Sequence, residues 1–292
     1  MFNSEHCSPS KKKNKYSCIR PVLLRKIAKI LNKHTNSKIK LNSKKQKLHS
    51  DISKAIQEIS KCKHEKCWIT IQILKNELSE KDLRLFEKNF RPTIPKEWIN
   101  NPNTWLSTTD INNVLAQYEI GYPNFKYLGA HPINFDTKLG DECVSNELCN
   151  IDIQELKKDK KTCLGIVLNT DPHHKSGKHW FSIYIDLKGV NRKGIPCIYY
   201  FDSVVGEPQK EVKDFIERIK SQYKEMNLDI DVLYNDIEHQ KGNTECGVYC
   251  LHFLVSMLKG KSFEKYINTL KNDKEMERFR NIFYTPLKDT FN

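Results

Sequence analysis

A polar turn around Gly242 leads directly into the apolar run 248–258, and Cys246 lies between them. The run is apolar around its whole circumference, which predicts a buried helix. Cys246 would then lie in the first turn of that helix, with Asn243 or Thr244 as its N-cap. Backbone N–H groups and the positive end of the helix dipole lower the pKa of a thiol in this position and enrich its nucleophilic thiolate. A cysteine taken alone is more often an inert core thiol, so the prediction of a nucleophile depends on its companions.

Such a thiol needs a base that accepts its proton and later protonates a leaving group. His179 stands immediately before the run 180–187, whose alternation predicts a strand, and a residue at a strand end can face a cleft. Asp202 ends the predicted strand 198–201 and could accept from the imidazole, which would fix its tautomer. His239 lies closer to the thiol in the chain and stays open as an alternative base.

Two further residues near Cys246 suit acyl transfer. Gln240, six residues earlier, carries an amide that could donate to an oxyanion together with the N–H of the cysteine. Such a donor contributes about 3 to 4 kcal/mol when it is measured by deletion. Gly247 has no side chain beside the sulfur and would leave room for a substrate carbonyl, whereas Cys250, one turn later, is predicted to be a core residue.

The second half of the chain predicts an α+β fold with a central mixed, largely antiparallel sheet. Strands are predicted over 164–170, 180–187, 198–201 and 230–234, and helices from Pro208 and over 248–258. Ser107 and Asp110 have the spacing of a capping box, which predicts a helix start at the entrance to this domain. The region between that helix and residue 160 shows no clear period.

Pro92, Pro95 and Pro102 mark a domain boundary. Before it, residues 1–19 are predicted to be a disordered basic tail because they are polar and rich in lysine. Residues 20–95 are predicted to form an N-terminal helical arm, with helices opening at Pro21 and Asp51. Residues 96–292 are predicted to form the core that carries the candidate site.

The chain has 292 residues and a formal net charge of +13, from 49 Lys and Arg against 36 Asp and Glu. Much of the excess lies near the N-terminus, which suits an anionic partner such as nucleic acid. The alternative is a lysine-rich composition that only keeps the chain soluble, since charge patterning alone rarely specifies a ligand.

The cysteines are interpreted from the expected compartment. No run of about 18 apolar residues occurs, so no membrane span is predicted, and the N-terminal residues lack the apolar core of a signal peptide. We therefore expect a protein that is not secreted, whose ten cysteines are thiols rather than disulfides. Cys62 and Cys67, like Cys143 and Cys149, are closely spaced, but not as in common zinc sites, so no metal is expected.

The chain resembles the ubiquitin-like-protein protease family, which includes the SUMO proteases and the adenovirus maturation protease. The resemblance rests on Gly177-Lys-His179-Trp180, Tyr200-Phe-Asp202-Ser203, Gln240 and Thr244-Glu-Cys246-Gly247. The order His, Asp, Gln, Cys is specific, and papain-like enzymes, in which Cys precedes His, are disfavoured. Segments 105–112, 167–171 and 176–180 are similar to the branch of the family in large nucleocytoplasmic DNA viruses, which includes polyprotein-processing enzymes.

The resemblance covers roughly 100–285 and implies a permuted papain-like cysteine protease core. It assigns catalytic roles to four residues: His179, Asp202, Gln240 and Cys246. Trp180, with Gly247 and Trp105, would line a narrow substrate channel that admits glycine, which implies a polypeptide substrate with a Gly-Gly-X or Gly-X-Gly site. No cofactor is implied, and the N-terminal arm would serve substrate or partner binding.

Three functions compete. The first is a cysteine endopeptidase that processes viral structural precursors, located in the virion and the host cytoplasm. The second is an isopeptidase that removes SUMO or ubiquitin from host conjugates. The third is a DNA-binding structural protein of the virion with an inert core, and the complete set of catalytic residue types argues against it.

Overall fold

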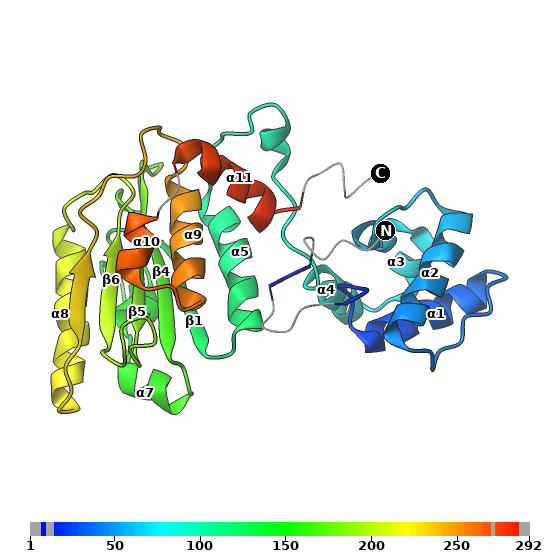
Figure 1. Cartoon of the computed structure of the whole chain (residues 1–292), viewed down its shortest axis with the longest axis horizontal. Coiled ribbons are helices and arrows are strands. Elements are labelled where there is room, and N and C mark those ends of the chain that lie inside the picture. The colour runs from blue at the N-terminus through cyan, green and yellow to red at the C-terminus, as the bar shows by residue number, and fades with distance from the viewer. Residues whose placement is uncertain (1–6, 10–14, 270–271, 286–292) are drawn as a thin grey trace. The chain divides into compact units, whose positions relative to one another are not determined.

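The computed structural model describes residues 7–9, 15–269 and 272–285, which divide into two compact units (Figure 1). Unit 1 holds the described residues up to Ile99 together with those from Asn281 onward, and unit 2 is Asn100–Arg280. The sequence interpretation kept the C-terminal residues in the core. They belong to unit 1 instead, because their backbone pairs with the segment around the boundary prolines: the N–H of Thr285 donates to a carbonyl there at 2.7 Å.

In the described residues of unit 1, all elements of regular secondary structure are helices. Its helices are α1 Pro21–His34, α2 Lys45–Ile59, the 3-10 helix η2 Glu65–Thr70, α3 Gln72–Glu77, α4 Glu80–Glu87 and the 3-10 helix η3 Lys96–Ile99. α1 opens with proline in its first turn, as predicted. α2 begins six residues before the predicted start at Asp51, because the buried Leu48 extends its apolar stripe by one turn.

The described part of the predicted tail is packed, which corrects the expectation of disorder there. Cys7 is buried and pairs with Phe90 in an isolated bridge, and Ser17 and Cys18 are also buried. The backbone N–H of Cys18 donates to the carboxylate of the buried Glu65 at 2.8 Å. Because Glu65 lies far from Cys18 in the chain, the composition of the tail alone could not predict this contact. Residues 1–6 and 10–14, which include three of the lysines of that tail, lie outside the described residues.

Six cysteines are joined, so the prediction of free thiols is wrong for them. The pairs are Cys7–Cys18, Cys62–Cys67 and Cys143–Cys149. Short chain separations of 11, 5 and 6 residues bring their Cα atoms to 5.0, 5.8 and 6.4 Å, within the range of disulfides. The prediction failed because it was argued from the expected compartment and not from local geometry. The other four cysteines form no disulfide and are buried.

Unit 2 contains a five-stranded mixed sheet of order β1-β4-β5-β6-β7. The strands of the unit are β1 Phe125–Pro132, β2 Lys138–Leu139, β3 Glu142–Cys143, β4 Cys163–Asn169, β5 Trp180–Asp186, β6 Cys197–Phe201 and β7 Asp231–Tyr234. Its helices are α5 Thr108–Gly121, α6 Asn146–Cys149, α7 Ile153–Lys158, α8 Lys210–Glu225, α9 Cys246–Leu258 and α10 Phe263–Asn268. The last helix, α11 Asp273–Phe283, begins in unit 2 and ends among the residues of unit 1.

The four predicted strands are confirmed, but the sheet is less antiparallel than predicted. β5 is antiparallel to both β4 and β6, whereas the outer pairs β1–β4 and β6–β7 are parallel. The prediction missed β1, in which the register shifts between Tyr127 and Ala130. A bulge of this kind interrupts the alternation by which a strand is recognised.

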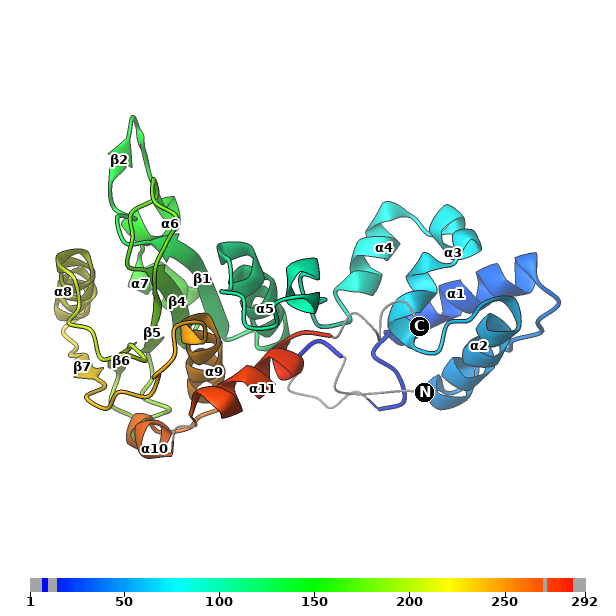
Figure 2. The ribbon, with the colours of Figure 1, turned by 90° about the horizontal axis from the view of Figure 1, so that it is seen from above.

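Helices cover both faces of the sheet, so unit 2 has three layers (Figures 1 and 2). α8 packs its apolar face on one side, with Phe215 and Ile219 in a core that includes Ile183 of β5. α9 packs on the other side, where Phe253 stacks on Phe201 of β6 with ring centroids 4.8 Å apart. The polar residues of β5, which alternate with the apolar ones, are therefore buried as well. Among the described residues, no helix is both long and apolar enough to cross a membrane.

Candidate active site

Two of the candidate residues lie at the same end of the sheet, where β5 begins and β6 ends. Ser182 of β5 pairs with Phe201 of β6 in antiparallel register, so β5 begins where β6 ends. His179, just before β5, and Asp202, just after β6, therefore lie next to each other at this end of the sheet. The Nε2 atom of His179 lies 2.6 Å from Oδ1 of Asp202.

Cys246 is the first residue of α9 and is 3% exposed. Its thiol lies close enough to the ring of His179 to affect the pKa of that ring. Because Nε2 faces Asp202, Nδ1 is the nitrogen left for the sulfur. The helix start is as predicted, but the cap is not: the N-cap is Glu245, which makes no side-chain cap hydrogen bond. The hydroxyl of Thr244 donates to the carboxylate of Glu245 and not to the helix.

The environment of His179 favours its charged form. Burial of the ring lowers its pKa, but the hydrogen bonds to Asp202 and Cys246, with the charges of both groups, outweigh this and raise the pKa from 6.5 to about 9. The ring is therefore an imidazolium at neutral pH. This positive charge beside Cys246 would stabilise negative charge that develops near the sulfur.

Asp202 is held by backbone groups on both sides. Its Oδ1 accepts from the N–H of Val204 at 3.0 Å, and its Oδ2 accepts from the N–H of Gly206 at 3.2 Å. A Cβ atom at Gly206 would lie 2.6 Å from Oδ2, so only glycine fits there. Asn235, which follows β7, pairs with the backbone of Asp202: its Oδ1 accepts at 2.9 Å and its Nδ2 donates at 2.7 Å. The sequence interpretation missed Asn235.

The loop before His179 is held by Asn169, the last residue of β4. Its Oδ1 accepts from the N–H of Lys178 at 3.2 Å, and the carbonyl of His179 accepts from the N–H of Thr170 at 2.9 Å. Gly177 has φ +86°, and a Cβ there would lie 2.8 Å from Nδ2 of Asn169. Asn169 was also missed, although its position at a strand end beside a glycine-containing loop was available as a signal.

Gln240 is buried, with its side-chain amide oriented by two contacts. The hydroxyl of Ser203 donates to Oε1 at 2.8 Å, so the nitrogen must point the other way. There Nε2 donates one hydrogen to the carbonyl of Gly242 at 3.0 Å. An amide nitrogen carries two hydrogens, so one remains to be donated.

The three predicted substrate-binding residues lie around one segment. The indole N–H of Trp180 donates to the carbonyl of Leu106 at 2.9 Å, and Trp105 next to it is 44% exposed. A Cβ atom at Gly247 would lie 2.9 Å from Cβ of Leu106. The missing side chain makes room for Leu106, so the packing of that segment against α9 is a second reason for a glycine here, and its role in substrate binding stays a prediction.

The alternative base is poorly suited to its task. His239 has its Nε2 buried without a hydrogen-bond partner, and its ring stacks on Phe201 at 6.1 Å. Burial, helped by the charge of Lys241, lowers its pKa to about 4. Cys250 lies in the core as predicted, and burial raises its pKa well above the ordinary value of a thiol.

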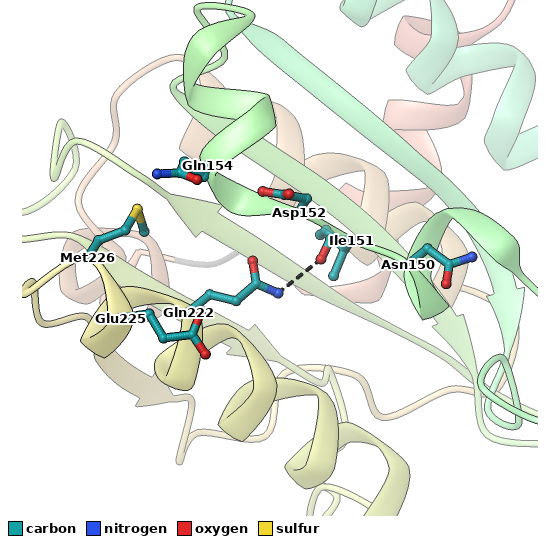
Figure 3. Close-up of a pocket in the computed structure, with 7 residues that line it drawn as sticks. All are labelled: Asn150, Ile151, Asp152, Gln154, Gln222, Glu225 and Met226. Carbon is teal, nitrogen blue, oxygen red and sulfur yellow. Dashed lines mark hydrogen bonds between the residues drawn. The ribbon is translucent and has the colours of Figure 1, made fainter.

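A pocket of about 490 Å³ lies elsewhere in unit 2, between α8 and the segment around the start of α7 (Figure 3). Its lining residues are Asn150, Ile151, Asp152, Gln154, Gln222, Glu225 and Met226. Gln222 closes part of it, because its Nε2 donates to the carbonyl of Ile151 at 2.9 Å. None of the candidate catalytic residues lines this pocket.

Comparison with known proteins identifies the class. The profile of the Ulp1 protease family, C-terminal catalytic domain, matches residues 149–292. A putative thiol protease of Acanthamoeba polyphaga mimivirus is 32% identical over 66% of this chain, which spans 60% of that relative's length. A SUMO-1 cysteine protease of African swine fever virus (isolate Pig/Kenya/KEN-50/1950) is 31% identical over 80% of this chain and 88% of its own.

The fold agrees with a solved structure. A crystal structure of an African swine fever virus protease superposes with a TM-score of 0.68, at 23% identity, over 97% of both chains. The protein thus has an α+β fold. It is a hydrolase of the cysteine peptidase class. It belongs to the Ulp1 family of SUMO-protease-type cysteine peptidases, as the sequence motifs indicate.

Proposed function

We propose that the protein is a cysteine endopeptidase that cleaves polypeptides after glycine-containing motifs. The observation that carries the proposal is the 2.6 Å contact of His179 with Asp202, on a ring that also contacts the thiol of Cys246. The imidazole of His179 thereby connects the nucleophile to the carboxylate that orients the base, as thiol-dependent acyl transfer requires.

The residues act in sequence in this mechanism. The thiolate of Cys246 attacks the scissile carbonyl carbon, and the oxygen becomes an oxyanion that accepts from the free N–H of Gln240 and from the backbone N–H of the cysteine. Collapse of this intermediate breaks the C–N bond as the imidazolium of His179 protonates the leaving amine. The neutral imidazole then takes a proton from water, which attacks the thioester and releases Cys246 as thiolate. Asp202 stabilises the imidazolium throughout.

The glycine preference is proposed from the walls of the site. Trp180 is fixed by its hydrogen bond to Leu106, and Leu106 packs on Gly247 at the start of α9. Bulky groups held this close to the nucleophile favour substrate residues without side chains, and the exposed Trp105 is available to contact the extended peptide. A permuted papain-like arrangement fits the chain order, because the base precedes the nucleophile.

We place the activity in the maturation of viral structural precursors, since the motifs resemble the viral branch of the family and the relatives described above are viral proteins. The alternative is removal of SUMO or ubiquitin from conjugates, which the names of the African swine fever virus relatives favour. The two differ in one requirement: a deconjugating enzyme needs the folded modifier, whereas a maturation enzyme needs only an extended peptide.

The test offers the protein three reporters: a Gly-Gly-X peptide, the matched Ala-Ala-X peptide and a SUMO fusion with the same scissile sequence. We expect turnover of the Gly-Gly-X peptide and little of the alanine peptide, with no gain of more than about tenfold in kcat/KM from the SUMO domain, which is about 1.4 kcal/mol. Turnover of the SUMO fusion alone would assign the protein to deconjugation. Turnover of none would refute the peptidase proposal.

A second proposal concerns unit 1, whose composition differs from the rest. The first 99 residues contain 24 of the 49 Lys and Arg but only 9 of the 36 Asp and Glu, so the remainder of the chain is nearly neutral. We propose that this unit binds nucleic acid through phosphate contacts, which carry little sequence preference.

The full chain should bind a fluorescent DNA duplex with an affinity that falls steeply with salt, by a logarithmic slope of about −0.9 per phosphate neutralised. Replacing the exposed Lys29, Lys38 and Lys40 by glutamate should weaken binding and flatten that slope. The matched triple change of the exposed Lys158, Lys188 and Lys224 in unit 2 should not. Equal effects of the two sets, or no binding at low salt, would exclude the proposal.

A further inference from the structure

The loop between β7 and α9 is held from outside by one carboxylate. Asp273, the first residue of α11, accepts through Oδ2 from the backbone N–H of Lys241 at 2.9 Å and of Gly242 at 2.7 Å. Its Oδ1 accepts from the hydroxyl of Tyr249, on α9, at 2.9 Å. The carboxylate therefore joins the loop that contains Gln240 to the helix that begins with the nucleophile.

The contact reaches Gln240 through one residue. Gly242 donates its N–H to Asp273, and its carbonyl accepts from Nε2 of Gln240 at 3.0 Å. Gly242 is also closely enclosed, because a Cβ there would lie 3.0 Å from Oε2 of Glu245 and 3.4 Å from Oδ2 of Asp273. Since Ser203 fixes the other end of the same amide, the direction of the free N–H of Gln240 depends on where Gly242 is held.

A second residue of α11 supports the same loop. Arg280, two turns after Asp273, is 4% exposed and donates from Nη2 to the carbonyl of Thr244 at 3.0 Å. The helix does not need Asp273 as its cap, because Oδ1 of Asn272 accepts from the N–H of Glu275 at 3.1 Å. The side chain of Asp273 is thus directed at the loop and not at its own helix.

We propose that Asp273 is a positioning residue for acyl transfer: it fixes the loop 240–245 so that the amide of Gln240 faces the developing oxyanion. This inference rests on the proposed peptidase function. Donors to an oxyanion act only at about 2.7 to 3.1 Å from it. Hydrogen bonds from backbone N–H groups to a carboxylate are strong enough to hold a loop to that tolerance.

The test separates oxyanion stabilisation from activation of the thiol. Alkylation of Cys246 by iodoacetamide forms no oxyanion, whereas hydrolysis of a Gly-Gly-X peptide does. In Asp273→Ala we expect kcat to fall by about 100-fold, the effect of misplacing a catalytic group by about 1 Å, with KM and the alkylation rate nearly unchanged. Asp273→Asn, which keeps an acceptor oxygen, should recover most of the activity. Lys274→Ala, at the exposed neighbouring position, is the matched control.

A double mutant gives the decisive comparison. If Asp273 acts through Gln240, then Gln240→Ala combined with Asp273→Ala should be no slower than Gln240→Ala alone. Independent, multiplying losses would overturn the inference, as would a parallel fall of hydrolysis and alkylation. If the alanine variant does not fold, Asp273→Glu keeps the charge but moves the acceptor, and normal kcat in that variant would overturn the inference. Failure of the wild-type protein to cleave any reporter would instead refute the proposed function.

Discussion

Replacing Cys246 by alanine is expected to lower kcat on a Gly-Gly-X peptide on the order of a million-fold, the loss seen when the nucleophile of a comparable triad is removed. The alanine variant has no atom that can form the acyl-enzyme, so only the background rate should remain. The fold should persist, because the site is built from backbone and side-chain contacts that do not involve the sulfur, such as the 2.6 Å contact of His179 with Asp202.

Hydrolysis by the variant should be measured beside its thermal unfolding and its affinity for the uncleaved peptide. The matched control is Cys250→Ala, one turn further along α9, where the thiol is buried and only fills the core. That control should lose stability but retain turnover. More than about 1% residual turnover in the Cys246 variant would mean that another residue is the nucleophile, since true nucleophile deletions leave far less.

The second large loss of kcat is expected when the carboxylate of Asp202 is removed. Asp202→Ala should lower kcat on the order of 10,000-fold, since the imidazole loses both its orientation and the stabilisation of its charge. Asp202→Asn should be less damaging. Its oxygen can serve His179 and the N–H of Val204, but its amide nitrogen then faces the N–H of Gly206, two donors in a place where the carboxylate accepts.

The pH profile identifies the cause of this loss. The pKa of His179 is raised from 6.5 to about 9, so the imidazolium is retained across neutral pH and lost as the pH rises through about 9. Peptide hydrolysis should therefore decline on the alkaline side near pH 9. The stabilisation from the pairing is fully present below about pH 6.5 and disappears over the same rise. In Asp202→Asn the alkaline limb should move to lower pH. An unchanged limb would show that another group controls it.

Much of unit 2 is predictable because its signals are local. Alternation marks β5, a long apolar run marks α9, and the capping box of Ser107 and Asp110 is present at the start of α5. Of the four residues predicted to be catalytic, His179 and Asp202 are marked by their places at strand ends and Cys246 by its place at a helix start, whereas Gln240 is marked only by its distance in sequence from Cys246. Antiparallel pairing of β5 with β6 then brings His179 and Asp202 together without any further information.

The supporting residues are harder to predict because their contacts are long-range. Asn235 and Asp273 act on backbone groups that lie 33 and 31 positions away in the chain. No pattern within a window of one element reports such a pairing. Glycine roles have the same difficulty. The contact of Gly247 with Leu106, which belongs to a distant segment, cannot be read from the sequence around the glycine.

The central claim, that His179 activates Cys246, is tested most directly by the chemistry of the cysteines themselves. Four form no disulfide, and all four are buried, so exposure alone does not distinguish them. Burial raises the pKa of Cys197 to about 11 and that of Cys250 well above its ordinary value, which leaves both as unreactive thiols. Only Cys246 combines a helix N-terminus with an imidazolium.

The measurement is the rate of iodoacetamide alkylation at each cysteine of the native protein at pH 7, read by peptide mass mapping, in the wild type and in His179→Gln. We expect Cys246 to react at least about 100-fold faster than the other free cysteines, since reactivity follows the thiolate fraction, and to lose this advantage in His179→Gln. Reaction of Cys246 at the rate of the core thiols, or an equal rate with and without the imidazole of His179, would contradict the account.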